Sequence, residues 1–92
     1  MDYEWDPAKS LLNEKKHGIS FEAALILWQS DTIEVEEIAY AKLESRSATL
    51  GIIGKKVYVV IWTRRKDKIR LITVRRARHH EEKLYQEKFQ IC

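Results

Sequence analysis

The sequence predicts an α+β fold in which two N-terminal helices and a C-terminal helix pack against an antiparallel sheet of about four strands. Apolar residues at helical spacing mark the N-terminal part of the chain, and two early glutamates favour a helix at its C-terminal end. The stretch between these two parts contains β-branched, alternating and wholly apolar segments that are typical of strands. No repeat, low-complexity stretch or linker rich in proline, glycine or serine interrupts the 92 residues. We therefore expect one domain, residues 1–92, whose 45% hydrophobic content is enough for a core.

The N-terminal segment predicts a short strand followed by a helix. We expect the strand at residues 3–5. Asp6 can cap a helix and Pro7 suits the first helical position, so a helix is expected over residues 7–16, closed by Gly18. Its apolar residues share one face: Ala8, Leu11 and Leu12.

A second helix is expected to begin at Ser20, because serine is a good N-terminal cap. Its apolar residues recur at helical spacing: Phe21, Ala24, Leu25 and Trp28. Such a stripe belongs to a core far more often than to a cofactor site.

Four strands and a closing helix are expected to follow. The strands are residues 32–38, 46–53, 57–63 and 69–75, and the helix is residues 77–89. The third strand is almost wholly apolar and is therefore predicted to lie at the centre of the sheet, covered on both faces. We expect the helices to pack on one face of the sheet and the strand arginines to project from the other, open face.

The last strand alternates, and this predicts which arginines share a face. A period of two puts Arg76 on the same face as Arg70 and Arg75 on the opposite face, unless a bulge at the strand end reverses the order.

Charge is distributed unevenly along the chain. Residues 1–45 hold 4 Lys/Arg against 10 Asp/Glu, whereas residues 46–92 hold 13 against 4. Such a split suggests a basic face for nucleic acid, although uneven charge can also be only a solvated surface, and the split alone does not name RNA.

Arginines and histidines in the basic half are the candidates for chemistry. They cluster at Arg70, Arg75, Arg76, Arg78, His79 and His80. Arg70 lies inside an apolar strand, so it must meet either an anionic ligand or an acidic partner such as Glu36 or Glu44. Arg46 opens another strand and can add a second guanidinium, a group that binds phosphate bidentately.

Other candidate residues have a bland alternative. His17 can act as a general acid or base, yet histidine is also favoured at a helix C-terminus by the helix dipole. Tyr85 can reach a phosphate, but packing on the sheet is the more common role. Adjacent His79 and His80 point about 100° apart, and the single cysteine is Cys92, so no zinc-type spacing is present and we expect neither metal nor cofactor.

Several segments occur together in one order along almost the whole chain. They are Tyr3-Glu4-Trp5-Asp6-Pro7-Ala8-Lys9, Lys15-Lys16-His17-Gly18-Ile19-Ser20-Phe21-Glu22-Ala23-Ala24, Glu44-Ser45-Arg46 before Leu50-Gly51, Val57-Tyr58-Val59-Val60, Trp62-Thr63-Arg64, Ile69-Arg70-Leu71-Ile72, and Arg75-Arg76-Ala77 followed by Glu81 and Tyr85. In this combination the chain resembles the BrnT toxins of bacterial type II toxin–antitoxin systems. It departs from the family pattern at Ser45 and Ser47, which flank Arg46, and at Arg78, where a threonine or serine often caps the last helix.

The resemblance implies a RelE-like fold and a metal-independent endoribonuclease. It also implies a BrnA-type antitoxin partner, with operator DNA bound only through the antitoxin. The catalytic residues expected from the match are Arg70, Arg76, Arg75, Arg46 and His17. The RNA-binding residues expected are Lys16, Arg64, Arg78 and Tyr85.

Two further functional classes stay open at this point. One is a basic nucleic-acid-binding module without catalysis, and the other is a protein that only pairs with the antitoxin as a corepressor. The acidic start and the lack of a long apolar run lead us to expect a cytoplasmic protein with no membrane segment.

Overall fold

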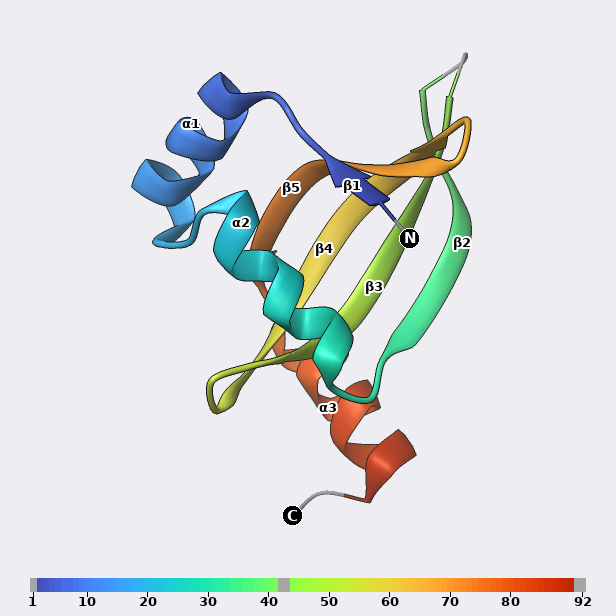
Figure 1. Ribbon diagram of the computed structural model, residues 1–92. Helices are drawn as coiled ribbons and strands as arrows, with labels where there is room; N and C mark the ends of the chain where they lie inside the picture. Colours follow the sequence, from blue (N-terminus) through green and yellow to red (C-terminus); the bar gives the residue numbers. More distant parts are fainter. Residues whose placement is uncertain (1, 42–43, 91–92) are drawn as a thin grey trace.

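The structure, a computed structural model, describes residues 2–41 and 44–90, and the side chains of these residues outside 36–45. The elements follow in the order β1 (Asp2–Glu4), α1 (Pro7–His17), α2 (Phe21–Ala24), the 3-10 helix η1 (Leu25–Gln29), β2 (Ile33–Ala41), β3 (Glu44–Ile53), β4 (Lys56–Arg65), β5 (Lys68–Arg76) and α3 (His79–Phe89) (Figure 1). The predicted α+β class is confirmed.

The sheet is larger than predicted and is mixed. Its strand order is β1-β5-β4-β3-β2. Strands β2 to β5 form the expected antiparallel meander, while β1 adds a fifth strand that runs parallel to β5. A parallel neighbour needs a long connection, and here the chain between β1 and β5 includes the whole rest of the sheet.

Helix α1 has the predicted ends. The Asp6 Oδ1 atom accepts a hydrogen bond from the Ala8 amide at 2.9 Å, and Pro7 occupies the first helical position. Gly18, with φ +75°, ends the helix in the left-handed region that favours glycine.

The apolar face expected for α1 is nevertheless not buried. Leu11 and Leu12 are 62% and 65% exposed, whereas Asn13 is the helix's buried residue. The helix is thus rotated with its apolar face toward solvent, because the Asn13 side chain makes hydrogen bonds to the backbone of β5.

The second helical segment begins as predicted, because the Ser20 Oγ atom accepts from the Ala23 amide at 3.1 Å. After one turn it tightens into η1. Three residues per turn brings Phe21, Ala24 and Leu27 onto one face, and all three are fully buried. Gly51 lets this segment approach β3, since a Cβ at that position would lie 2.6 Å from Leu27 Cγ.

Two apolar clusters lie on opposite faces of the sheet. The face that we call the α2 face carries Ile19, Phe21, Ala24, Leu27, Val60, Trp62, Ile69, Leu71 and Val74. The face that we call the α3 face carries Ala48, Leu50, Val57, Val59, Ile61 and Tyr85. The central position predicted for residues 57–63 is confirmed, but the expectation that all helices share one face is wrong. Tyr85 brings α3 onto the face opposite α2.

A bulge in β5 changes which arginines share a face. Ile61 pairs with Thr73 and Trp62 pairs with Leu71, so Ile72 is an extra residue in β5. Beyond the bulge, Arg75 pairs with Val59 of the α3 face. Before it, Arg70 pairs with Thr63, which alternates with Trp62 and also faces the α3 side. The prediction that Arg76 shares the face of Arg70 is therefore wrong, and Arg75 does so instead.

In the part of the chain that the structure describes, no helix is both long and apolar enough to cross a lipid bilayer.

Candidate functional site

A row of polar side chains crosses the α3 face beyond the end that α3 covers. We call it the α3-face row, and it consists of Glu4, Arg70, Thr63 and Arg46. Glu4 of β1 pairs with Arg70 of β5, and Arg70 pairs with Thr63 of β4. Since Ser47 pairs with Trp62, Arg46 of β3 stands next to Thr63 in the antiparallel register. Four strands therefore bring two arginines and one carboxylate to one line.

The Arg70 guanidinium is held by Glu4. Its Nη1 atom donates to Glu4 Oε2 at 3.1 Å, and the two side chains are 29% and 30% exposed. The acidic partners considered from the sequence, Glu36 and Glu44, have side chains outside the described residues. Glu4 was not singled out by the sequence reasoning. The only signal for it was its place between two aromatic residues in a strand predicted to begin the chain.

Arg46 and Thr63 complete the row at different depths. The Arg46 side chain is half-buried, while Thr63 is buried at 2% exposure between the two arginines. The row is thus a shallow surface with charged ends and a small neutral centre.

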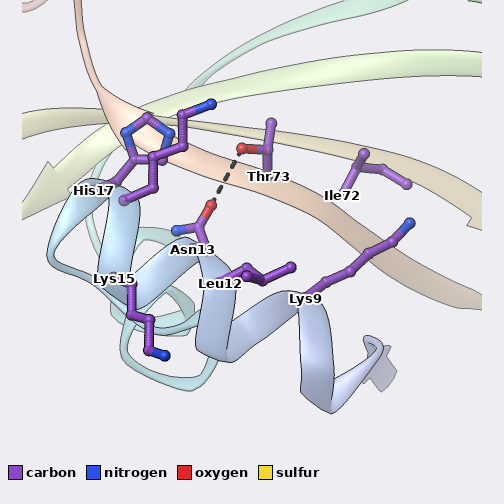
Figure 2. Close-up of a pocket in the computed structure, with 8 residues that line it drawn as sticks. Lys9, Leu12, Asn13, Lys15, His17, Ile72 and Thr73 are labelled. Atoms are coloured by element: carbon purple, nitrogen blue, oxygen red, sulfur yellow. Dashed lines mark hydrogen bonds between the residues drawn. The ribbon is translucent and has the colours of Figure 1, made fainter.

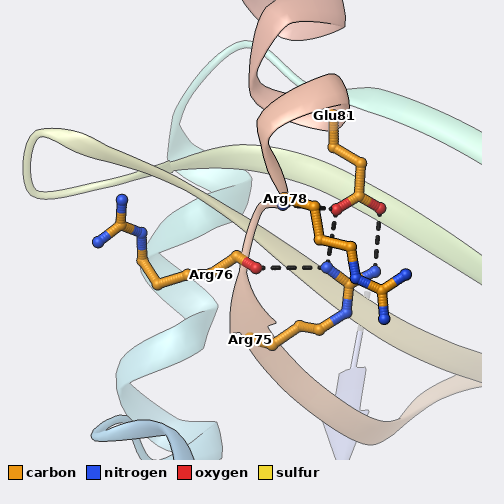
Figure 3. Close-up of polar contacts among 4 residues, drawn as sticks. All are labelled: Arg75, Arg76, Arg78 and Glu81. Atoms are coloured by element: carbon orange, nitrogen blue, oxygen red, sulfur yellow. Dashed lines mark hydrogen bonds and ion pairs between the residues drawn. The ribbon is translucent and has the colours of Figure 1, made fainter.

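Arg75 is bound into the start of α3, as Figure 3 shows. Its Nη1 and Nη2 atoms donate to the two carboxylate oxygens of Glu81 at 2.7 and 2.9 Å, a bidentate pair. Glu81 Oε1 also accepts from the Arg78 amide at 2.8 Å. The hydrogen bonds from Arg75 lower the pKa of Glu81 from its usual 4.5 to about 2, against the opposing effect of burial.

Helix α3 begins without a side chain that caps its free amides. Arg78 occupies the cap position, and a guanidinium has no acceptor for the free amides of the first turn. Glu81 instead supplies the reverse half of a capping box by accepting from the Arg78 amide.

The other predicted arginines point elsewhere. Arg76 lies on the α2 face, with its guanidinium carbon 5.7 Å from the Tyr58 ring and Nη2 4.0 Å from Glu82 Oε2. Arg64 is exposed on that same face, 6.0 Å from the Trp62 ring. The structure therefore does not gather the predicted arginines into one cluster.

Tyr85 is placed in the core. It is 1% exposed, and its hydroxyl donates to the Asp31 carbonyl oxygen at 2.6 Å. Burial raises the pKa of this phenol. The position agrees with the packing alternative, because Tyr85 fastens α3 to the beginning of β2.

Lys16 and His17 line a cavity between α1 and β5, shown in Figure 2. Its volume is about 520 Å³, and its lining residues are Lys9, Leu12, Asn13, Lys15, Lys16, His17, Ile72 and Thr73. Asn13 joins the two walls: its Nδ2 donates to the Val74 carbonyl at 3.0 Å and its Oδ1 accepts from the Val74 amide at 3.2 Å. This side chain completes the ladder at the edge of β5 beyond the point where β1 ends.

Among residues 2–35 and 46–90, whose side chains the structure describes, no group of three His, Cys, Asp or Glu side chains is placed to hold a metal ion. His79 and His80 are exposed in the first turn of α3. Cys92 lies outside the described residues.

Comparison with known proteins agrees with the resemblance of the motifs. Residues 5–81 match the model of the family described as ribonuclease toxin, BrnT, of type II toxin–antitoxin system. A search of curated proteins found no match. The family match covers every β-strand except β1 and reaches into α3. The chain therefore belongs to the BrnT family of ribonuclease toxins of type II toxin–antitoxin systems.

Proposed function

We propose that this protein is a metal-independent endoribonuclease of the cytoplasm that arrests growth and is neutralised by a BrnA-type antitoxin. In the complex, operator DNA is contacted by the antitoxin alone. The observation that carries the catalytic part is the Arg70 side chain, 29% exposed and 3.1 Å from the Glu4 carboxylate, on the end of the α3 face that α3 leaves uncovered.

Arg70 and Arg46 are the groups that we propose to hold the phosphate. They stand on strands separated only by β4, so their Cα atoms are about 10 Å apart at the usual strand spacing. Two long side chains can converge on one phosphate across that distance. Guanidinium groups bind two phosphate oxygens at once and stabilise the charge that grows on them in the transition state. This chemistry supplies positive charge without a metal ion.

The reaction that we propose is transesterification within the RNA strand. The ribose 2′-oxygen loses its proton and forms a bond to the adjacent phosphorus. The bond between phosphorus and the 5′-oxygen then breaks, and that oxygen takes up a proton. The products are a 2′,3′-cyclic phosphate and a 5′-hydroxyl end. Holding the two oxygens and the phosphorus in line provides much of the rate gain.

We propose Glu4 as the group that takes the 2′-hydroxyl proton. Its carboxylate belongs to the same row as both arginines and is fixed by Arg70. His17, which the sequence suggested for proton transfer, lies on the far side of Ile72 in the cavity beside α1. Comparing Glu4→Gln with His17→Gln separates the two assignments, because only the variant of the true base loses cleavage while keeping RNA binding.

A second reading follows from the same ion pair. Glu4 neutralises Arg70, so the pair can serve only to join β1 to β5, and the protein would then bind RNA or antitoxin without cleaving. This reading predicts that Arg70→Ala changes the stability of the protein. It also predicts that cells grow normally whether they express wild type or Arg70→Ala.

Growth after induced expression distinguishes these functions. We expect wild type to stop growth, co-expressed antitoxin to restore it, and Arg70→Ala to be harmless. Lys55→Ala, in the exposed turn between β3 and β4, is the matched control and should remain toxic. Thermal melts of the purified variants show whether Arg70→Ala is folded. Normal growth with soluble, folded wild type would contradict the catalytic proposal.

A further inference from the structure

Helix α1 presents apolar and basic side chains together on its outer surface. Ala8, Leu11 and Leu12 are exposed, the two leucines at 62% and 65%. Two adjacent leucines this exposed form a contiguous apolar patch, and large patches of this kind mark interaction sites on soluble proteins. We call these three residues, together with the cavity between α1 and β5, the α1 surface.

The orientation of α1 is fixed by hydrogen bonds. Asn13 Nδ2 donates to the carbonyls of Ile19 and Val74, and its Oδ1 accepts from the Val74 amide and the Thr73 hydroxyl, all at 2.9 to 3.2 Å. A buried side chain with four partners holds the helix against rotation about its axis. The leucines therefore point outward because the fold requires Asn13 to point inward.

The rim of the cavity is basic. Lys9, Lys15 and Lys16 line it, no carboxylate is among its described lining residues, and Leu12 and Ile72 supply apolar walls (Figure 2). A ligand that complements this cavity therefore carries both negative charge and apolar groups on the same molecule.

We propose that the α1 surface binds an acidic, amphipathic segment of the antitoxin. RNA would satisfy the lysines with phosphates, but it offers little to two exposed leucines, and among the described residues that line the cavity only His17 has a ring on which a base can stack. A protein segment carries both kinds of group, apolar anchors for Leu11 and Leu12 and carboxylates for the lysines. The inference rests on the proposed function only in taking the antitoxin as the partner.

The surface also adjoins the α3-face row. Ile72 follows Arg70 by two residues on β5, a distance of about 7 Å along the strand. A segment bound to the α1 surface would therefore lie close to the guanidinium that we propose to hold RNA.

The test measures antitoxin binding and RNA cleavage on the same purified proteins. The probe is the purified protein encoded next to this toxin. The variants are Leu12→Asp and the pair Lys9→Glu with Lys15→Glu. The matched control for Leu12→Asp is Leu84→Asp, which replaces an exposed leucine of α3. The matched control for the lysine pair is Lys55→Glu in the turn between β3 and β4.

We expect each α1 variant to raise the Kd for the antitoxin about tenfold or more, as loss of an interface anchor does, while both controls bind like wild type. Cleavage of RNA without antitoxin should be unchanged in all of them. If wild type binds the antitoxin through Leu12 but cuts no RNA, the ribonuclease proposal is contradicted, whereas the proposal that the α1 surface binds the antitoxin is supported.

Three results overturn the inference. One is unchanged antitoxin affinity in both α1 variants. Another is loss of RNA cleavage with normal antitoxin binding, which would assign the surface to RNA. The third is wild type that does not bind the probe at all. Because Leu12, Lys9 and Lys15 are exposed, the variants should fold, and circular dichroism checks this.

Discussion

The arginines of β5 differ in how firmly their own acids hold them. Arg75 donates two hydrogen bonds to Glu81, at 2.7 and 2.9 Å, and the carboxylate is anchored further by the Arg78 amide. Arg70 donates one hydrogen bond at 3.1 Å to Glu4 on an edge strand. A ligand phosphate can replace the single contact more easily than the bidentate one, so we propose Arg70 rather than Arg75 as the arginine that binds the phosphate.

Glu81 makes stability depend on pH in the acid range. Its folded-state pKa of about 2 lies below the usual 4.5, so the carboxylate stabilises the fold fully above about 4.5 and progressively less as the pH falls toward 2. Glu81→Gln should lower the free energy of unfolding by about 1.5–3 kcal/mol at pH 7, the range for a hydrogen bond to a charged group. Urea titrations at pH 7 and near pH 2 measure the difference.

The acid-range difference is the informative part of that experiment. Wild type and Glu81→Gln should converge in stability as the pH approaches 2. The exposed neighbour Glu87→Gln on the same helix serves as control and should change little at either pH. A stability gap that stays constant from pH 7 to pH 2 would show that the Arg75 pair is not its source.

Sequence reasoning found the important residue types but not their partners. Arg70 was identified because a charged side chain within an apolar strand needs an anionic partner, whatever the fold. The face shared by Arg70 and Arg75 could not be predicted, because it depends on the one-residue bulge at Ile72. Glu4 could not be assigned to Arg70 either, since the two residues meet only through a parallel pairing between the ends of the chain.

At the scale of the element, α1 is defined by the side chain that fastens it to the sheet. Strand β1 covers the edge of β5 only from Lys68 to Arg70. Asn13 takes over farther along, where its amide group pairs with both backbone groups of Val74 as a strand would. A free strand edge inside the protein would otherwise leave buried polar groups without partners.

Replacing Asn13 by alanine should therefore be severe. The change removes two donors and two acceptor contacts from a buried site, which we expect to lower the free energy of unfolding by about 2–3 kcal/mol. For a domain of this size the melting temperature should fall by about 10 °C or more. Glu14→Ala, one residue along on the exposed side, is the control. A loss as small as that of the control would mean that the edge of β5 needs no such cap.

Element boundaries followed from the sequence where local chemistry sets them. Asp6, Pro7 and Gly18 fixed α1 to within a residue, and Ser20 fixed the next helical start. The orientation of α1 did not follow, because amphipathicity predicts burial of the leucines while one asparagine decides otherwise. The switch from α2 to η1 was also missed, and the close approach of Leu27 to Gly51 accompanies it.

At the scale of the whole molecule, the two faces of the sheet are covered to different extents. The α2 face is covered by the helical segment Phe21–Gln29 and closes the larger core, while α3 covers only one end of the other face (Figure 1). The α3-face row lies at the end of this face that α3 does not cover. The basic second half of the sequence supplies β3, β4 and β5, so its arginines reach this surface from neighbouring strands.

The function could be predicted from the order of motifs better than from any single residue. The ordered segments carried the family, and residues 5–81 match the family model. The site could not be predicted with the same success, because strand order, the bulge and the parallel β1 pairing are properties of the assembled sheet.

The central claim is that Arg70 supports RNA cleavage without a metal ion. The most direct measurement is the cleavage rate of a single-stranded RNA by the purified protein in excess chelator, for wild type, Arg70→Ala and the control Lys55→Ala. We predict that wild type and the control cut the RNA and leave 2′,3′-cyclic phosphate ends, and that Arg70→Ala is slower by about 10²–10³-fold while still folded. Equal rates for Arg70→Ala and wild type, or cleavage that stops when the chelator is added, would contradict the claim.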